Sequence, residues 1–118
     1  MSSTMLRRAL FLFGGLHHQC LTNDLLKYCP MQNLWTKIET SSSAPSPREH
    51  ALLIPIHDSS LLVYGGIDLT SELLFSDAYL YHDEWKPVSV RGNPSPRLKM
   101  GQAVLGNRIF VFGGEGPS

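Results

Sequence analysis

The sequence predicts an all-β protein that is built from a repeated strand unit of about 50 residues. An apolar run that ends in a pair of glycines occurs three times, at 11–15, 62–66 and 110–114. The first glycines of the three pairs, Gly14, Gly65 and Gly113, follow one another at 51 and 48 residues. Short runs of β-branched, aromatic and other apolar residues, bounded by glycine, proline, asparagine and aspartate, are typical of β-strands.

Three further kinds of landmark keep the same period. They are the pairs Trp35 and Trp85, Asp24 and Asp77, and the Ser-Pro-Arg segments 46–48 and 95–97, whose members lie 50, 53 and 49 residues apart. Agreement between four kinds of landmark makes a chance repeat a poor explanation. The repeat, and not any single motif, therefore predicts the fold.

These landmarks resemble the kelch repeat, in which Pro-Arg, a strand with histidine, a strand ending in Gly-Gly, a strand with Asp and Tyr, and a Trp strand follow in order. The resemblance implies an incomplete kelch-type β-propeller of about two and a half four-stranded antiparallel blades. We expect the last three strands of one blade, with its first strand missing, in residues 7–43. A complete blade is expected in 44–92, and the first two strands of a third in 93–118.

Most of the recurring residues have a structural explanation. Glycine pairs suit turns with unusual backbone angles and leave room for neighbouring aromatics. Large amphipathic rings fill the space between stacked sheets, and the arginine and histidine at a strand start are expected to make structural hydrogen bonds. The expected structural motif residues are Gly14, Gly15, Trp35, Arg48, His50, Gly65, Gly66, Tyr81, Trp85, Gly113 and Gly114.

Composition narrows the function further. The 118 residues carry ten Lys and Arg against ten Asp and Glu, and this balance argues against direct nucleic-acid contact. No apolar run approaches the length of a membrane span. The segment Arg7–Phe13 is only faintly like a secretory leader, because its apolar run stops at a glycine pair. Two cysteines are too few for a disulfide framework, so a cytoplasmic location is expected, with the nucleus as the alternative.

No recognisable catalytic constellation is present, and we expect no cofactor and no metal. His17, His18 and Cys20 form the one tight group of potential zinc or copper ligands, but a further ligand cannot be assigned. Tyr28 and Cys29 invite comparison with the copper site of galactose oxidase. Neighbours on a strand point to opposite faces, so these two cannot simply crosslink to each other.

Binding is expected on the loops that follow the glycine pairs and on the loops that enter the next blade. In an antiparallel blade these loops emerge on one face, and long loops on a rigid scaffold are where binding residues concentrate. The candidate partner-binding residues on this face are His17, His18, Asp68, Glu72 and Arg97.

The resemblance implies a non-catalytic interaction module that binds another protein or peptide, of adaptor or scaffold type. Self-association through open blade edges is a further option, since an incomplete ring leaves edges unpaired. The alternative is the propeller piece of a kelch-containing enzyme, such as a leucine carboxyl methyltransferase relative in wybutosine synthesis on transfer RNA. In that case the catalytic parts would lie outside these residues.

Overall fold

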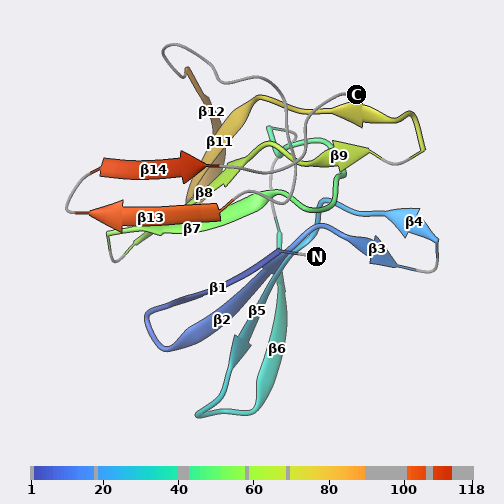
Figure 1. Cartoon of the computed structure of the whole chain (residues 1–118). Coiled ribbons are helices and arrows are strands. Elements are labelled where there is room, and N and C mark those ends of the chain that lie inside the picture. The colour runs from blue at the N-terminus through green and yellow to red at the C-terminus, as the bar shows by residue number, and fades with distance from the viewer. Residues whose placement is uncertain are drawn as a thin grey trace.

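The computed structural model describes residues 2–17, 19–39, 43–57, 59–68 and 70–89. It describes only the backbone of His17 and of two later strands, at 101–105 and 108–112. All regular secondary structure in these residues is β-strand (Figure 1), which confirms the all-β prediction. Nowhere in the described part of the chain is there a helix of the length and apolarity that a membrane span requires.

Two four-stranded antiparallel sheets form the body of the molecule, and we call them the first and second blades (Figure 1). The first blade has the strand order β1-β2-β5-β6, and the second has the order β7-β8-β11-β12. Their strands are β1 (Ser2–Leu6), β2 (Ala9–Phe13), β5 (Leu25–Cys29), β6 (Leu34–Ile38), β7 (Leu52–Ile56), β8 (Ser60–Tyr64), β11 (Ala78–His82) and β12 (Glu84–Val88). A third sheet pairs β13 (Gly101–Leu105) with β14 (Arg108–Phe112).

The first blade contains a strand that the sequence did not predict. Ser2–Leu6 pairs with β2 in antiparallel register, from Ser2 opposite Phe13 to Leu6 opposite Ala9. The expectation that this blade lacks its first strand was therefore wrong. Its sequence, Ser-Ser-Thr-Met-Leu, carries neither the Pro-Arg pair nor the histidine that mark the start of the next repeat. Backbone pairing and a hydrogen bond from Ser2 Oγ to the carbonyl of Ala51, 2.5 Å long, hold it instead.

The main core lies between the two blades. The second strand of each blade contributes alternate residues, as expected where one sheet face is buried. Buried members of this cluster are Ala9, Phe11, Phe13 and Leu25 from the first blade, and Ala51, Leu53, Leu61, Val63 and Trp85 from the second. The Trp85 ring packs edge-on against Phe13 with ring centroids 5.5 Å apart. The aromatic residues predicted to fill the space between sheets do so at Trp85.

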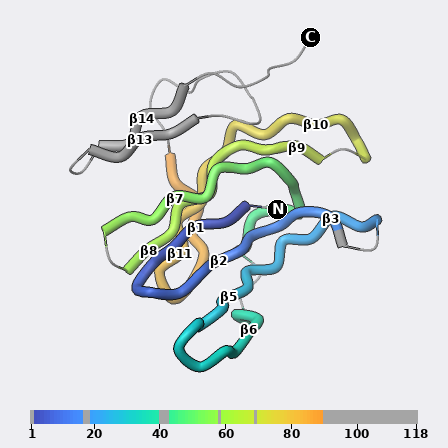
Figure 2. The backbone as a smooth tube through the Cα atoms, turned by 60° about the horizontal axis from the view of Figure 1, so that its bottom comes forward, coloured from blue at the N-terminus to red at the C-terminus, as the bar shows by residue number. Residues whose placement is uncertain are grey.

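Two small hairpins project from the same side of the molecule (Figures 1 and 2). They are β3 (Leu16–His17) with β4 (Cys20–Leu21), and β9 (Ile67–Asp68) with β10 (Leu73–Leu74). Each follows a glycine pair. The β1–β2 and β7–β8 turns lie on the opposite side of the molecule.

Candidate binding face and the joint that supports it

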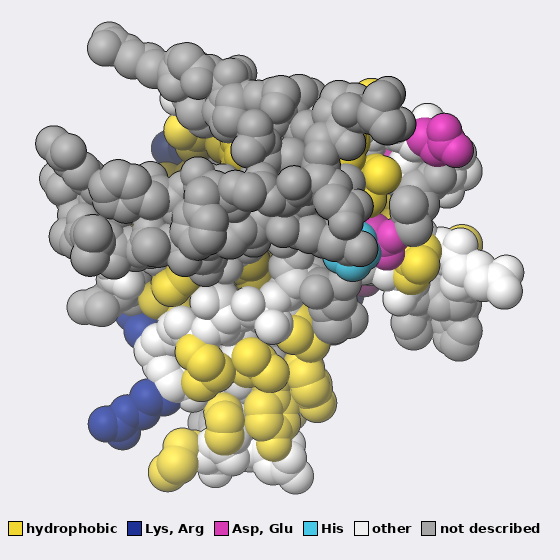
Figure 3. Space-filling model, viewed as in Figure 1, with side chains coloured by type: hydrophobic (Ala, Val, Ile, Leu, Met, Phe, Trp, Pro, Cys, Tyr) yellow, Lys and Arg dark blue, Asp and Glu magenta, His cyan; other side chains and the backbone are white. Residues whose placement is uncertain are grey.

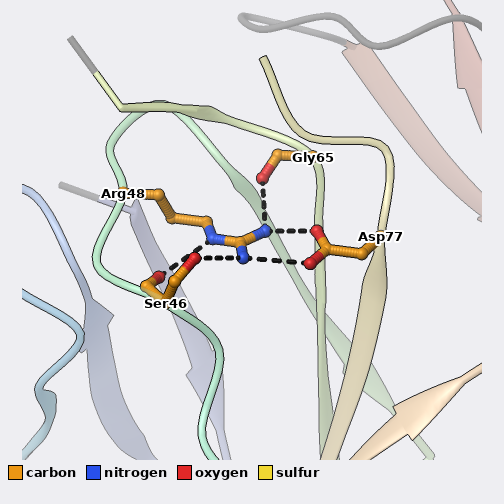
Figure 4. A network of polar contacts seen from close by, with 4 residues as sticks. All are labelled: Ser46, Arg48, Gly65 and Asp77. Carbon is orange, nitrogen blue, oxygen red and sulfur yellow. Dashed lines mark hydrogen bonds and ion pairs between the residues drawn. The ribbon is translucent and has the colours of Figure 1, made fainter. Parts of the chain in front are cut away.

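Arg48 ties the segment that connects the two blades to the second blade, and we call this network the joint (Figure 4). Its side chain is fully buried and forms a two-pronged ion pair with Asp77, with Nη1–Oδ1 and Nη2–Oδ2 distances of 2.5 and 3.1 Å. The guanidinium also donates to the Gly65 carbonyl and to both Ser46 oxygens, at 3.0 to 3.1 Å. These five bonds occupy all five N–H donors of an arginine. Arg48 therefore has no donor left for a ligand and acts as a structural tie.

The Phe75 ring packs against the guanidinium group of Arg48. The guanidinium carbon of Arg48 lies 3.9 Å from the centre of the Phe75 ring, in cation–π geometry. Phe75 begins the segment that leads from β10 to β11, and its N–H donates to the Gly66 carbonyl at 2.9 Å. The base of the β9–β10 hairpin is thus fixed to the joint by both side chain and backbone.

The glycine pairs close against the segment that carries Arg48. Gly14 and Gly15 have φ of 68° and 94°, angles that favour glycine. A Cβ atom on Gly14 would lie 2.5 Å from the Arg48 carbonyl oxygen, which already accepts the Gly15 N–H at 2.9 Å. A Cβ on Gly66 would meet the Glu49 carbonyl oxygen at 2.9 Å. One segment therefore lies against the glycine turns of both blades.

The remaining motif residues differ in their environments. Tyr81 packs against Trp85 with ring centroids 5.2 Å apart. Trp85 is 1% exposed, whereas Trp35, its counterpart in the first blade, is 53% exposed and contacts Tyr28. His50 is exposed, has φ of 58° and lies before β7, not within the strand. Gly113 and Gly114 lie outside the described residues.

Among the candidate partner-binding residues, Asp68 and Glu72 lie on the β9–β10 hairpin. Asp68 is half-buried and accepts the Thr70 N–H at 3.0 Å, which braces the tip of the hairpin. Glu72 is exposed and has φ of 56°. His17 lies on β3, where its backbone pairs with Cys20. His18 and Arg97 fall outside the described residues.

The sequence did not predict that the loops after the glycine pairs would form hairpins. Strands of two residues are too short to show the alternation that identifies a strand. The apolar Leu73–Leu74 pair was the available signal.

The described residues hold no group of three side chains from His, Cys, Asp and Glu that could bind a metal ion. Tyr28 and Cys29 point to opposite faces of their blade: Tyr28 stacks on Trp35, and Cys29 packs against the core between the blades. This arrangement agrees with the argument that they do not crosslink to each other.

The chain belongs to the Kelch-repeat family, since the family model for the KLHDC2/KLHL20/DRC7 Kelch-repeats domain matches residues 1–118. Relatives include the dynein alpha chain of the flagellar outer arm of Chlamydomonas reinhardtii, 31% identical over 99% of this chain and 3% of its own length. The leucine-zipper-like transcriptional regulator 1 homolog of Drosophila melanogaster is 26% identical over 90% of this chain and 12% of its own length. Host cell factor of the same organism is 30% identical over 98% of this chain and 9% of its own length. The chain thus spans a small part of the proteins it matches, and Kelch repeats are typically protein-interaction modules.

Proposed function

We propose that this chain is a non-catalytic protein-interaction segment that binds a protein or peptide with the side formed by the β3–β4 and β9–β10 hairpins. The observation that carries the proposal is the attachment of the β9–β10 hairpin to a buried joint. Phe75 at its base stacks on the Arg48 guanidinium, and Glu72 near its tip is exposed. A rigid base with an exposed polar tip suits recognition, because little order is lost on binding.

The chemistry of the joint supports a binding role over a catalytic one. Arg48, the most buried cation in the described residues, donates its hydrogen bonds to oxygen atoms of the protein itself. Its partner Asp77 is held by two of those bonds. Neither group is presented to a substrate. We place the activity in the cytoplasm or the nucleus, consistent with two free cysteines.

The test is a hairpin replacement with a matched control. Residues 69–72 are replaced by Asn-Gly, which shortens the β9–β10 hairpin to a tight turn. The control replaces Asp83, in the β11–β12 turn at the other end of the second blade, by glycine, which suits the φ of 63° there. Proteins captured by the unaltered chain are identified by mass spectrometry, and their binding to purified chains is then measured by calorimetry. We expect a purified partner to lose at least about tenfold affinity for the hairpin variant, or about 1.4 kcal/mol, and to retain it for the control. Equal affinities for both variants would contradict the proposal.

We also propose that the isolated chain self-associates through the outward face of the first blade. Trp35 is about half exposed there, at 53%, and contacts Tyr28 on the same face. In the second blade, the position of Trp35 is taken by Trp85, which the first blade covers. A second copy of the chain would remove this apolar surface from water.

A further inference from the structure

A basic pocket opens at the β1–β2 turn of the first blade. It has a volume of about 310 Å³, and its lining includes Arg7, Arg8, Lys27, Cys29 and Met31. Lysine and arginine side chains, dark blue in Figure 3, project on this side of the first blade. The pocket combines cationic groups with an apolar wall.

The three cations have no carboxylate partner among the described residues. The ion pairs of that part of the chain join Lys37 to Asp24 and Arg48 to Asp77. No aspartate or glutamate lines the pocket. Lys27 contacts the Phe11 ring, 5.9 Å from the ring centre, which leaves its charge uncompensated. The pocket thus concentrates three positive charges in a chain whose formal net charge is zero.

Arg7 and Arg8 are unfavourable residues for the turn that they form. Leu6 pairs with Ala9, so Arg7 and Arg8 alone make the turn, and their φ values are 51° and 60°. A two-residue hairpin with both φ positive strongly prefers Asn-Gly. Side chains at both positions strain the backbone. An Asn-Gly pair would relieve this strain but would remove both charges.

A second pocket occupies the equivalent place in the second blade and shows what is special about the first. Its lining includes Ser60, His82, Glu84 and Lys86, and its volume is about 330 Å³. Ser60 begins the second strand of its blade as Ala9 does, and His82 ends the third strand as Cys29 does. This pocket holds one carboxylate, Glu84, beside its one lysine, Lys86. A pocket therefore occurs at the same place in both blades. Of the two pockets, the one in the first blade has positive charges without a carboxylate.

We infer that the pocket lined by Arg7, Arg8 and Lys27 binds the carboxylate side chains of an acidic peptide segment from a protein partner. Arginine donors match carboxylates in two-pronged geometry. The Cys29 and Met31 wall suits the methylene groups of glutamate, which a bare phosphate lacks. The site begins at Ala9, five residues before the glycine pair, or about 17 Å away at roughly 3.3 Å per residue. It is therefore separate from the hairpin side that we propose as the main binding face.

Fluorescence anisotropy with a fluorescein-labelled oligoglutamate peptide and the full 118-residue chain tests the inference. The main variant is Arg7→Asn with Arg8→Gly, which removes two charges and supplies the pair that the turn prefers. We expect about tenfold weaker peptide binding together with a higher melting temperature. Lys27→Gln should weaken binding too, and Lys86→Gln, in the equivalent pocket, is the matched control and should not.

Several results would overturn the inference. They are no binding to the unaltered chain, unchanged binding by the double variant, or an equal loss in the Lys86→Gln control. Tighter binding of a single-stranded oligonucleotide of equal charge would reassign the pocket to nucleic acid and reject the acidic peptide. The hairpin replacement described above leaves these three cations in place. Its outcome and the outcome of this experiment are therefore independent.

Discussion

Arg48 shows how one residue can hold a repeat boundary together. A buried arginine is tolerated only when its charge and its donors are all satisfied. Here Asp77, Gly65 and Ser46 meet that need from three separate segments. The side chain thereby fixes the position of the segment whose carbonyl group receives the Gly15 N–H.

Replacing this arginine should therefore destabilise the chain far more than replacing a surface cation. Arg48→Gln leaves Asp77 without its ion pair, and we expect a loss of about 3 kcal/mol in the free energy of unfolding. Lys37→Gln removes the exposed pair with Asp24, whose Nζ–Oδ1 distance is 3.5 Å, and should cost less than about 0.5 kcal/mol. Urea unfolding followed by circular dichroism measures both. Similar losses for the two variants would show that Arg48 is not the tie described here.

Tyr81 provides a pH-dependent test of the packing between blades. Burial raises the pKa of the Tyr81 phenol above its ordinary value of 10.0, and the nearby Asp83 carboxylate raises it further. The neutral phenol is thus favoured in the folded chain. Its contribution to stability is fully present below about pH 10 and is lost as the pH rises through the folded pKa.

The measurement is an absorbance titration of tyrosinate, with Tyr81→Phe used to assign the signal. Asp83→Asn should lower the pKa of Tyr81 but leave it above the ordinary value, because burial is the larger cause. A Tyr81→Phe chain that loses the earliest-titrating tyrosine would contradict this assignment.

At the scale of elements, equivalent strands of successive blades have different environments. Trp35 on β6 and Trp85 on β12 both occupy the second position of the last strand of a blade. The first blade covers Trp85 through Phe13, while Trp35 faces outward. Burial of a blade's tryptophan thus depends on the neighbouring blade and not on its own strand.

Single-tryptophan chains should report this difference directly. With Trp35→Phe, the remaining Trp85 should emit at short wavelength and resist acrylamide quenching. With Trp85→Phe, the remaining Trp35 should emit at longer wavelength and be quenched readily. Trp85→Ala should cost about 3 kcal/mol or more in the free energy of unfolding, and Trp35→Ala less than about 1 kcal/mol. Equal quenching of the two tryptophans in a monomeric chain would contradict the arrangement of the blades.

The sequence predicted the repeat and most of the strands because glycine pairs, tryptophans and Pro-Arg segments are local marks. It could not predict the different burial of Trp35 and Trp85, because both occur in the same local pattern and only their neighbours differ. The strand Ser2–Leu6 was not predicted because its sequence carries no landmark of the repeat. It is identified as a strand only by its pairing with β2. Arg7 and Arg8 looked like the start of a faint leader, and only the three-dimensional structure brings Lys27 to the same pocket.

At the scale of the whole molecule, the outward face of the first blade carries an apolar surface. Figure 3 shows hydrophobic side chains, in yellow, gathered over the region of β5 and β6. Leu10 and Leu12 on this blade are half-buried, whereas Leu61 and Val63, at the same positions of the second blade, are 2% and 0% exposed. Exposed apolar patches of this kind mark association surfaces.

The isolated chain should therefore associate in a concentration-dependent way. Trp35→Ser should shift the mass measured by light scattering after size-exclusion chromatography toward that of the monomer. Val88→Ser is the control, since Val88 is also partly exposed, at 38%, but lies on the second blade. A monomer with a cooperative melt in the unaltered chain would contradict self-association.

The hydrogen bond from Gly15 to the Arg48 carbonyl group has a consequence for protein engineering. Exchange of blades between propellers is usually imagined with cuts in the linkers, where one repeat ends and the next begins. In this chain such a cut would separate the glycine turn from the arginine segment that it contacts. A chimaera spliced instead at Asp83, in the tight β11–β12 turn, would inherit Gly15, Arg48 and Asp77 together from a single parent.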